Sequence, residues 1–356
     1  MAVDRVLVTG ATGFLAAHCI EELLTHGYRV RGSVRDLRTA QTAHLREIAE
    51  HAGGELEFVE VTLDSDAGWA EAVAGCAYVL HVASPFPDRI PKDENELIKP
   101  AVEGTLRVLR AANAGGVRRV VLTSSVAAIS YGHDDSRTLT EADWTLLDAA
   151  DAYPKSKTLA ERAAWEYAGE SGLELVAINP GAIFGPLLRP QRPTSMEAVR
   201  RIMSGQLPAL PRIGWSPVDV RDLATAHRLA MEQPEAAGNR YICAGSHLWM
   251  RDMARILAGE YAPRGYSIAT RSMPYWLMWI LGRFDSTVRL ALGFYGHNQT
   301  VSAAKAADEL GWTMRPVRET IVDAAESLIR HGVVTAKGDP RPSTVDGSSL
   351  PQRSRR

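Results

Sequence analysis

The stretch that decides the fold runs from Val6 to His18 and reads "VLVTGATGFLAAH". It starts as a short apolar strand, continues through Gly10 and Gly13, and becomes a helix-forming run from Phe14 onward. Glycine lets the backbone turn tightly and approach a pyrophosphate, and the N-terminus of a helix favours the charge of such a group. Two glycines alone would indicate only a tight turn. In the context of strand, turn and helix, we interpret the stretch as a dinucleotide-binding loop.

Segments typical of strands and of helices alternate through the first half of the chain. Short β-branched runs occur at 5–8, 28–34, 56–61, 78–82, 119–123 and 173–179, and helical patterns lie between them at 14–26, 39–52, 67–74, 95–114 and 154–171. This alternation is typical of a parallel sheet with right-handed crossovers. The sequence therefore predicts the α/β class, with a Rossmann-type doubly wound parallel sheet.

The regular pattern weakens after residue 180. Short helical segments follow at 194–205, 222–232, 250–260 and 302–310, separated by loops that contain proline and glycine. We predict a dinucleotide-binding Rossmann domain at 1–180 and a smaller, mostly helical substrate-binding part at 181–334, from which strands could return to the main sheet. Residues 335–356, rich in Pro, Ser, Gly and Arg, are predicted to form a disordered tail.

The composition argues against several classes of protein. The formal net charge of −2 over 356 residues gives no general attraction to nucleic acid or to a membrane. The three cysteines are far apart, and the N-terminal strand leaves no room for a signal peptide, so we expect a cytoplasmic protein. The sequence has no H-E-x-x-H metal motif and no G-x-S-x-G elbow of a serine hydrolase, so no metal site is expected.

The most apolar run is Met273–Leu281, "MPYWLMWIL". It is too short to span a bilayer, which needs about 20 residues. We interpret it as a helix of the core or of a substrate pocket, with an exposed interaction face as the alternative.

The end of the second predicted strand, "GSVRD", bears on the choice of dinucleotide. Enzymes that use NAD typically place an acidic residue there, on the ribose hydroxyls, whereas Val34 occupies this position here and Arg35 follows it. A guanidinium suits a 2′-phosphate by its charge and its fork geometry. Arg31 or Arg38 could assist. We predict NADP(H), with NAD(H) as the alternative because Asp36 lies only two positions further along.

A tyrosine and a lysine open the helical pattern that follows the fifth predicted strand. Tyr153 and Lys157 are separated by four positions and so share one helix face. A free tyrosine has a pKa near 10, and an ammonium group nearby favours the phenolate. The same ammonium can bond to ribose hydroxyls. We interpret the pair as a proton donor and its partner, because it occurs in a chain that already has a dinucleotide loop.

The fifth predicted strand ends in "VVLTSS", which brings Ser124 and Ser125 to the carboxyl edge of the sheet. Two serines after a strand are most often loop residues. Beside a cofactor site, one of their hydroxyl groups could hydrogen-bond to a carbonyl substrate.

Taken together, these motifs resemble the extended short-chain dehydrogenase/reductase superfamily, and within it the dihydroflavonol-4-reductase-like branch. That branch includes plant dihydroflavonol and cinnamoyl-CoA reductases and microbial aldehyde or ketone reductases. The resemblance covers residues 3–331 and is carried by "VTGATGFLAAH", "VRGSVRD", "HVASPF", "VEGTLRVLRAA", "VLTSS", "YPKSKTLAERAAW", "INPGAIFGP" and "VDVRDLATAH".

The resemblance implies a role for each matching residue. Ser125 would polarise the carbonyl oxygen, Tyr153 would deliver the proton, and Lys157 would tune Tyr153 and bind the ribose. The implied cofactor residues are Gly10, Thr12, Gly13, Phe14, Leu15, Arg35, Leu63, Val82, Ala83, Ser84, Thr123, Tyr153, Lys157, Pro180, Gly181 and Ile183; the implied substrate residues are Ser84, Phe86, Ser125, Tyr153 and Leu187. The chain departs from the branch at Thr62-Leu63, where an Asp-Leu pair is usual.

The sequence therefore predicts an NADPH-dependent reductase of a ketone or aldehyde, whose small-molecule substrate is bulky and hydrophobic. The alternatives are a nucleotide-sugar epimerase or dehydratase, a 3β-hydroxysteroid dehydrogenase, and a non-catalytic NADP(H) sensor. Sensors of this fold usually lose the tyrosine–lysine pair, which this chain keeps. We expect a monomer or a homodimer.

Overall fold

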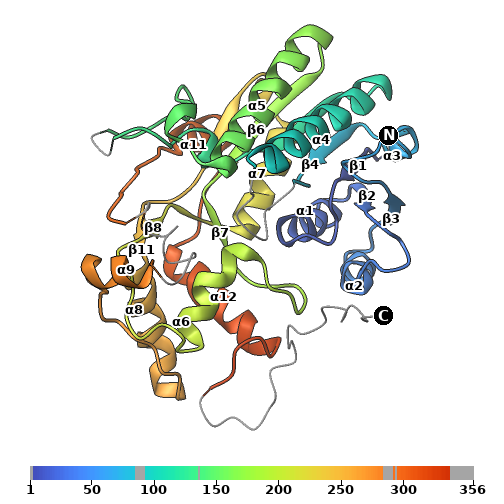
Figure 1. The fold of residues 1–356 in the computed structure, drawn as a ribbon. Coiled ribbons are helices and arrows are strands. Elements are labelled where there is room, and N and C mark those ends of the chain that lie inside the picture. The colour runs from blue at the N-terminus through green and yellow to red at the C-terminus, as the bar shows by residue number, and fades with distance from the viewer. Residues whose placement is uncertain (1–2, 85–92, 135–136, 284–291, 293–294, 337–356) are drawn as a thin grey trace, which may run out of the picture.

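The computed structural model describes residues 3–84, 93–134, 137–283, 292 and 295–336. Its main sheet has seven parallel strands in the order β10-β6-β5-β4-β1-β2-β3 (Figure 1). They are β1 (Arg5–Val8), β2 (Arg29–Val34), β3 (Leu56–Glu60), β4 (Tyr78–His81), β5 (Arg119–Thr123), β6 (Glu174–Pro180) and β10 (Arg240–Cys243). The strand order reverses between β1 and β4, which is where ligands bind in such sheets. The predicted fold class is confirmed.

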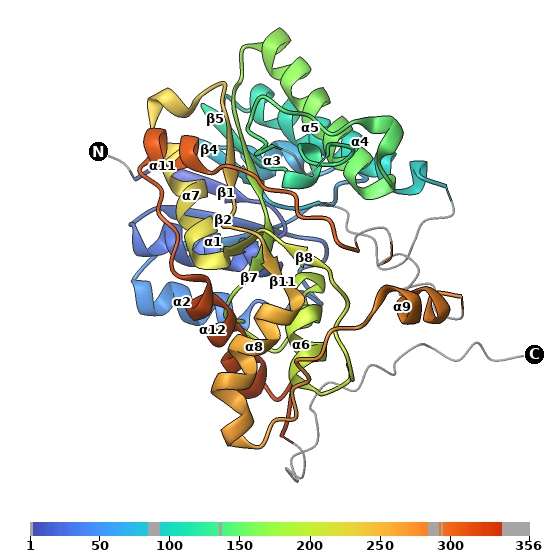
Figure 2. The ribbon, with the colours of Figure 1, turned by 90° about the vertical axis from the view of Figure 1, so that its left-hand side faces the viewer.

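Helices cover both faces of the main sheet (Figure 1, Figure 2). Strand β1 shows why, because Val6 and Val8 pack into one apolar cluster and Leu7 into another, and all three are fully buried. Side chains alternate between the faces of a strand, so one short apolar strand supports two helical layers. The first layer contains α1 (Phe14–Thr25), α2 (Ala43–Ala52) and α7 (Val220–Glu232); the second contains α3 (Trp69–Val73), α4 (Asn95–Ala114) and α5 (Ala152–Ser171).

A separate apolar core lies in the C-terminal part of the chain. It forms between α6 (Glu197–Met203), α8 (Met250–Tyr261) and α12 (Val317–Arg330), with Leu257 and Tyr261 fully buried at its centre. Two small sheets adjoin it: β7 (Ala182–Phe184) pairs with β9 (Pro217–Asp219), and β8 (Gly214–Trp215) pairs with β11 (Leu248–Trp249). The remaining elements are α9 (Tyr275–Leu281), α11 (Ala304–Leu310) and the 3₁₀ turns η1 (Val126–Ala128), η2 (Leu147–Ala149), η3 (Thr194–Met196), η4 (Pro234–Ala236) and η5 (Ala262–Arg264).

One strand from the C-terminal half belongs to the main sheet. Strand β10 pairs in parallel with β6, so that Arg240 lies opposite Ala177 and Cys243 opposite Pro180. No strand was predicted at these positions, although a return of the chain to the sheet was allowed for. The sheet therefore contains residues from both sides of the predicted boundary at residue 180.

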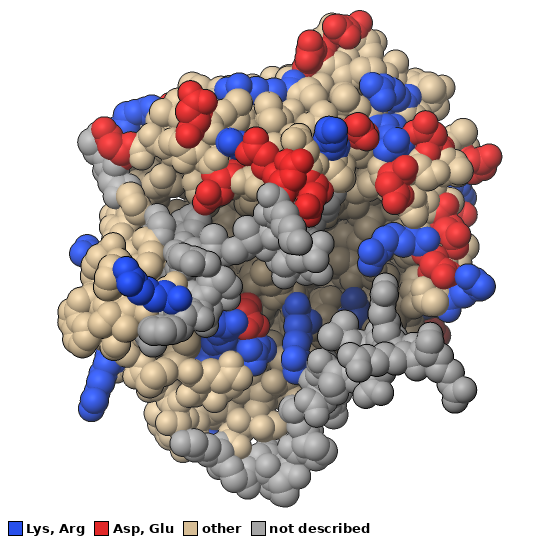
Figure 3. Space-filling view, in the orientation of Figure 1, with Lys and Arg blue, Asp and Glu red and all other residues tan. Residues whose placement is uncertain are grey.

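Helix α9 differs from the first interpretation of the run Met273–Leu281. Met278 is buried, but Tyr275, Trp276, Trp279 and Ile280 are exposed, Trp276 by 63%. The interpretation as a core helix is wrong for these four side chains, and an exposed face describes them. Figure 3 shows lysine and arginine but no aspartate or glutamate on the visible surface around α9.

The described residues include neither a candidate membrane span nor a cluster of metal-ligating side chains. Within them, no helix has both the length and the apolar character that crossing a bilayer requires. Over the same part of the chain, no three His, Cys, Asp or Glu side chains gather in a way that could hold a metal ion. Nearly all of the predicted disordered tail, from residue 337 on, lies outside the described residues.

Candidate dinucleotide and catalytic site

The glycine loop joins β1 to α1 at the carboxyl edge of the sheet. Gly10 has a φ of +70°, and a Cβ there would come within 3.0 Å of the Cβ of Ala83. Gly13 precedes α1 and donates its N–H to the Gly10 carbonyl at 2.8 Å, and no side chain caps the helix. The loop is therefore compact, lacks side chains where a Cβ would crowd it, and leaves the helix N-terminus to a ligand. These features fit a bound pyrophosphate.

Two side chains that the sequence analysis did not identify fasten this loop to the end of β4. The Thr9 hydroxyl accepts a hydrogen bond from the Ala83 N–H at 2.9 Å and lies 3.0 Å from Nδ1 of His81. His81 is buried, and burial lowers its pKa to about 3, so its ring is neutral. This contact fixes Val82 and Ala83 beside the glycine loop, where the resemblance places them.

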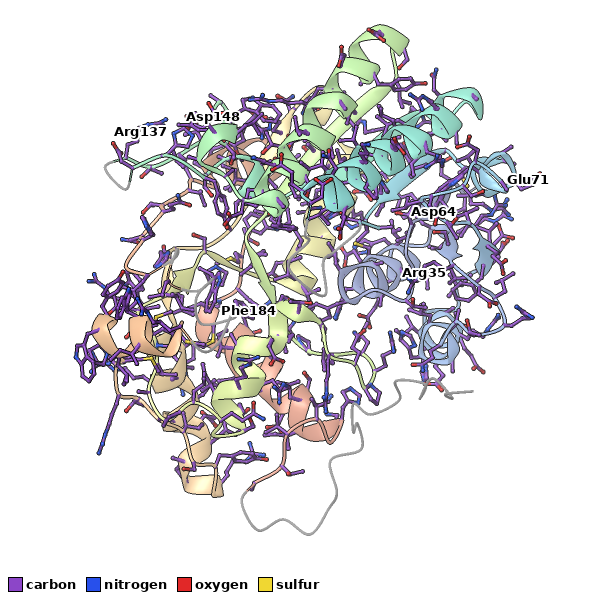
Figure 4. All side chains as sticks on the ribbon, viewed as in Figure 1. Arg35, Asp64, Glu71, Arg137, Asp148 and Phe184 are labelled. Atoms are coloured by element: carbon purple, nitrogen blue, oxygen red, sulfur yellow. The ribbon has the colours of Figure 1, made fainter. Side chains whose placement is uncertain are left out.

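The end of β2 presents a cation without a local partner. Arg35 is exposed, and within the described residues it makes no ion pair; Figure 4 labels it in the region of α1 and α2. Asp36 instead accepts from the backbone N–H of Arg38 at 2.8 Å and pairs with its guanidinium at 3.4 Å. The alternative carboxylate thus has neighbours of its own, while Arg35 remains available to a ligand.

Arg31, suggested as a helper of Arg35, has a different role. Its guanidinium pairs with Glu57 at 2.7 Å and donates to the carbonyls of Glu71, Ala72 and Ala74. Cations favour the carbonyl-rich C-terminus of a helix, here that of α3. Arg31 therefore has a structural role, in which it ties β2 to the end of α3. The prediction that it assists Arg35 in binding a phosphate is wrong.

The structure brings the predicted catalytic side chains together. Tyr153 is the second residue of α5, and the Ser125 hydroxyl, at the start of η1, hydrogen-bonds to its side chain. Burial raises the pKa of Tyr153, and the bond from Ser125 opposes that rise. The tyrosine is therefore protonated at neutral pH, as a proton donor must be. Pro154 lies in the first turn of α5, where a missing N–H costs nothing.

Lys157 lies one turn further along α5 and is buried. Its ammonium donates to the Thr123 carbonyl at 3.4 Å. Burial lowers the pKa of Lys157 to about 8, against a smaller opposing effect of Glu161. That Lys157 tunes Tyr153 stays a prediction.

Glu161 continues the same helix face and anchors the residues around it. It is 1% exposed, and its carboxylate accepts from Ser124 Oγ, from Asn179 Nδ2 at 2.9 Å and from Arg240 Nε at 2.6 Å. Asn179 also donates to the Ser125 carbonyl at 3.2 Å. This network was missed, although the spacing of Tyr153, Lys157 and Glu161 by four was a readable signal.

Thr123 is held by a second buried histidine. Its hydroxyl lies 2.8 Å from Nε2 of His227, whose Nδ1 lies 2.8 Å from the Leu223 carbonyl. Since the carbonyl can only accept, Nδ1 carries the proton and Nε2 accepts from Thr123. Burial lowers the pKa of His227 to about 4, which keeps this neutral arrangement.

The remaining predicted residues differ in position. Pro180 is buried, and a Cβ at Gly181 would come within 1.9 Å of the Ser216 carbonyl oxygen, so only glycine fits there. Ser84 is exposed, whereas Leu187 is 2% exposed and packs into the C-terminal core. Phe86 lies outside the described residues. Leu63 packs near Gly104 of α4, and Ile183 lies half-buried in β7.

Comparisons with known proteins agree with this fold. Residues 6–244 match the NAD dependent epimerase/dehydratase family. The chain is 35% identical over 344 residues to cinnamoyl-CoA reductase 1 of Petunia hybrida, covering 94% of this chain and 96% of the relative. The structure of yeast methylglyoxal/isovaleraldehyde reductase Gre2 complexed with NADPH is similar with a TM-score of 0.75 and 31% identity, over 93% of this chain and 100% of that one. Vestitone reductase from alfalfa gives a TM-score of 0.75 at 27% identity, over 93% and 99%.

The chain belongs to the NAD dependent epimerase/dehydratase family. The resemblance to extended short-chain dehydrogenases/reductases of the dihydroflavonol-4-reductase-like branch is confirmed by relatives that are named reductases, and with it the predicted classification as an oxidoreductase.

Proposed function

We propose that the protein is an NADPH-dependent reductase that converts a ketone or aldehyde into an alcohol. The observation that carries this proposal is the hydrogen bond between Ser125 and Tyr153, with Lys157 one turn along α5, beside the glycine loop. The reductase names of the relatives support it. A carbonyl oxygen that binds at the two hydroxyl groups has both a hydrogen-bond donor and a proton source.

The catalytic roles follow from the protonation states. Tyr153, whose pKa is raised by burial, holds its proton until negative charge develops on the substrate oxygen, and then transfers it. Ser125 stabilises the same oxygen by hydrogen bonding. Lys157 keeps a positive charge near the resulting phenolate and donates to the ribose. General acid catalysis of this kind typically contributes roughly 10²- to 10⁴-fold in rate.

The cofactor site is proposed from the same edge of the sheet. Gly10, Thr12, Gly13, Phe14 and Leu15 would hold the diphosphate on the N-terminus of α1, and the exposed Arg35 would bind the 2′-phosphate. When bound, the reduced nicotinamide supplies the hydride to the carbonyl carbon. NAD(H) is the less favoured cofactor, because the Asp36 carboxylate is engaged with Arg38.

The substrate is proposed to lie between the dinucleotide part (1–180) and the helical part (181–334). Figure 3 shows the surface hollowed between these two parts, with both acidic and basic side chains around it. Relatives named for cinnamoyl-CoA and tetraketide α-pyrone support a bulky, largely apolar carbonyl compound. We propose that the enzyme acts as a monomer or homodimer in the cytoplasm.

The test is oxidation of NADPH and NADH by the purified protein with a panel of aromatic and aliphatic aldehydes and ketones. We expect turnover of at least one bulky carbonyl compound with NADPH, and a Tyr153→Phe variant that binds NADPH but does not turn over. Full activity in Tyr153→Phe would contradict the role of Tyr153 as proton donor. If the wild-type protein binds the cofactor but turns over none of the compounds, it is better explained as a non-catalytic sensor.

The main rival is a nucleotide-sugar epimerase or dehydratase, since the matching family is named for epimerases and dehydratases. That reading predicts copurified oxidised cofactor and turnover of a nucleotide sugar. A 3β-hydroxysteroid dehydrogenase would use the same residues in reverse, and oxidation of such a steroid with NADP⁺ or NAD⁺ would reveal it.

A further inference from the structure

A loop of the helical part returns to the glycine loop. The segment between β7 and η3 carries Arg189, whose Nη2 donates to the Thr12 carbonyl at 2.9 Å and whose Nη1 donates to Gln41 Oε1 at 2.9 Å. In Figure 1 the chain between β7 and α6 extends toward α1 and α2. Thr12 lies in the glycine loop, and Gln41 lies on the connection that leaves β2 just after Arg35. Arg189 therefore bridges the two segments that border the adenosine side of the proposed cofactor site.

The partners of Arg189 are all neutral. Among the described residues it forms no ion pair with a carboxylate, and its Nε is buried without a hydrogen-bond partner. Burial lowers the pKa of the guanidinium, and its two hydrogen bonds go to neutral oxygens. A buried donor that lacks a partner destabilises the protein until an acceptor binds to it. Such an arrangement favours an anionic ligand.

His44, near the start of α2, lies close to Arg189 and also has a buried nitrogen, Nε2, without a hydrogen-bond partner. Burial, and then the charge of Arg189, lower the pKa of His44 to about 4, so the ring is neutral at pH 7. A neutral imidazole can still donate one hydrogen bond. Two donors without acceptors thus lie next to a loop that is shaped for phosphate.

We infer that Arg189, assisted by His44, binds a phosphate of the dinucleotide and supplies a second cation opposite Arg35. The inference rests on the proposed function, and it adds that the helical part recognises the cofactor directly. Arg189 can reach the phosphate only when the loop between β7 and η3 is seated on the glycine loop. Cofactor binding and the seating of this loop are therefore coupled.

The test is direct binding, measured by titration calorimetry with NADPH, NADH and 2′,5′-ADP on the full-length protein. The variant is Arg189→Met, which keeps the length and removes the charge, and the matched control is Arg192→Met in the same loop. We expect NADPH to bind roughly 10- to 100-fold more weakly to Arg189→Met, as for the loss of a charge-assisted hydrogen bond, and within about twofold of wild type in the control. His44→Ala should weaken binding in the same direction by a smaller factor.

The three ligands show whether Arg189 contacts the 2′-phosphate or the diphosphate of the dinucleotide. If Arg189 contacts the 2′-phosphate, binding of NADPH and 2′,5′-ADP falls while that of NADH is unchanged; if it contacts the diphosphate, NADPH and NADH fall together. Unchanged NADPH binding in Arg189→Met, with or without a lower melting temperature, overturns the inference and leaves only a structural tie. If Arg189→Met does not fold, Arg189→Lys is measured instead, and it should keep part of the wild-type affinity for NADPH. A wild-type protein that binds neither dinucleotide refutes the proposed function itself.

Discussion

Two helices of this molecule depart from the usual distribution of polar and apolar side chains in opposite ways. In α5, the polar residues Lys157, Thr158 and Glu161 are 9% exposed or less. In α9, Trp276 and Trp279 are exposed by 63% and 46%. The buried polar side chains of α5 are hydrogen-bonded, Thr158 within its own helix and Lys157 and Glu161 to neighbouring segments. In α9, Tyr275 contacts Tyr295 and Arg283 lies over Trp279, yet the apolar face stays largely exposed. Burial of polar groups must be compensated, so the departure in α5 is the one that indicates function.

The largest effect is expected at the start of α5. Tyr153→Phe removes the proposed proton donor and little else, because the ring stays in place. We expect kcat to fall by roughly 10²- to 10⁴-fold, with NADPH affinity within about threefold of wild type. Steady-state kinetics and calorimetry give the two numbers. A comparable loss in cofactor affinity would show that Tyr153 acts in binding rather than in proton transfer.

The next effect concerns stability. Glu161→Ala leaves Arg240 buried opposite no carboxylate and removes the acceptor of Ser124 and Asn179. Breaking a buried ion pair from one side typically costs about 3–5 kcal/mol, so we expect the free energy of unfolding to drop by that order. Denaturant unfolding measures it. Glu161→Gln keeps a hydrogen-bonding side chain and should lose less; an equal loss would show that the charge is what matters.

A third effect follows from the Lys157 pKa of about 8, lowered from 10.5 by burial. The lysine is charged in both folded and unfolded states at pH 7, and between pH 8 and 10.5 only the unfolded state keeps the proton. The buried ammonium of Lys157 therefore lowers the free energy of unfolding by its full amount below pH 8. This destabilisation decreases as the pH rises from 8 to 10.5. We expect Lys157→Met to raise the free energy of unfolding at pH 7 by on the order of 1 kcal/mol or more, while activity is lost.

The same pKa predicts the pH profile of the wild-type enzyme. The positive charge near Tyr153 is lost as the pH rises through about 8, so kcat/KM should decline above that value by up to tenfold per pH unit. In Glu161→Gln the decline should begin at lower pH, because Glu161 raises the Lys157 pKa. A profile that is flat from pH 7 to 10 would contradict this role of Lys157.

The smallest effect is expected on α9. Trp276→Ala removes a side chain that is mostly exposed, and such substitutions usually change stability by less than about 0.5 kcal/mol. Leu257→Ala, on the buried face of α8, should cost about 2–5 kcal/mol. Thermal unfolding compares the two. A large loss in Trp276→Ala would mean that the apolar face of α9 is covered in solution.

The same comparison shows what the sequence could predict. Six of the seven strands and the helices between them follow from periodicity, since each short apolar run serves two faces of one sheet. The glycine loop and the face of Tyr153 and Lys157 follow from spacing within single segments. Strand β10 was missed because its Arg240 looks like a surface residue, and its burial depends on a distant partner, Glu161. The contacts of His81 and Arg189 join distant segments, and no local pattern reveals them.

Strand β10 also has a consequence for the order in which the chain can mature during synthesis. The edge of β6 is complete only when residues 240–243 are alongside it, so a nascent chain that has just completed β6 still presents an unpaired strand edge. Ribosomes add about 5–20 residues per second, and this open edge therefore persists for several seconds. Release of the chain before residue 243, through a premature stop codon or a stalled ribosome, should yield an aggregating fragment rather than a smaller dinucleotide-binding protein.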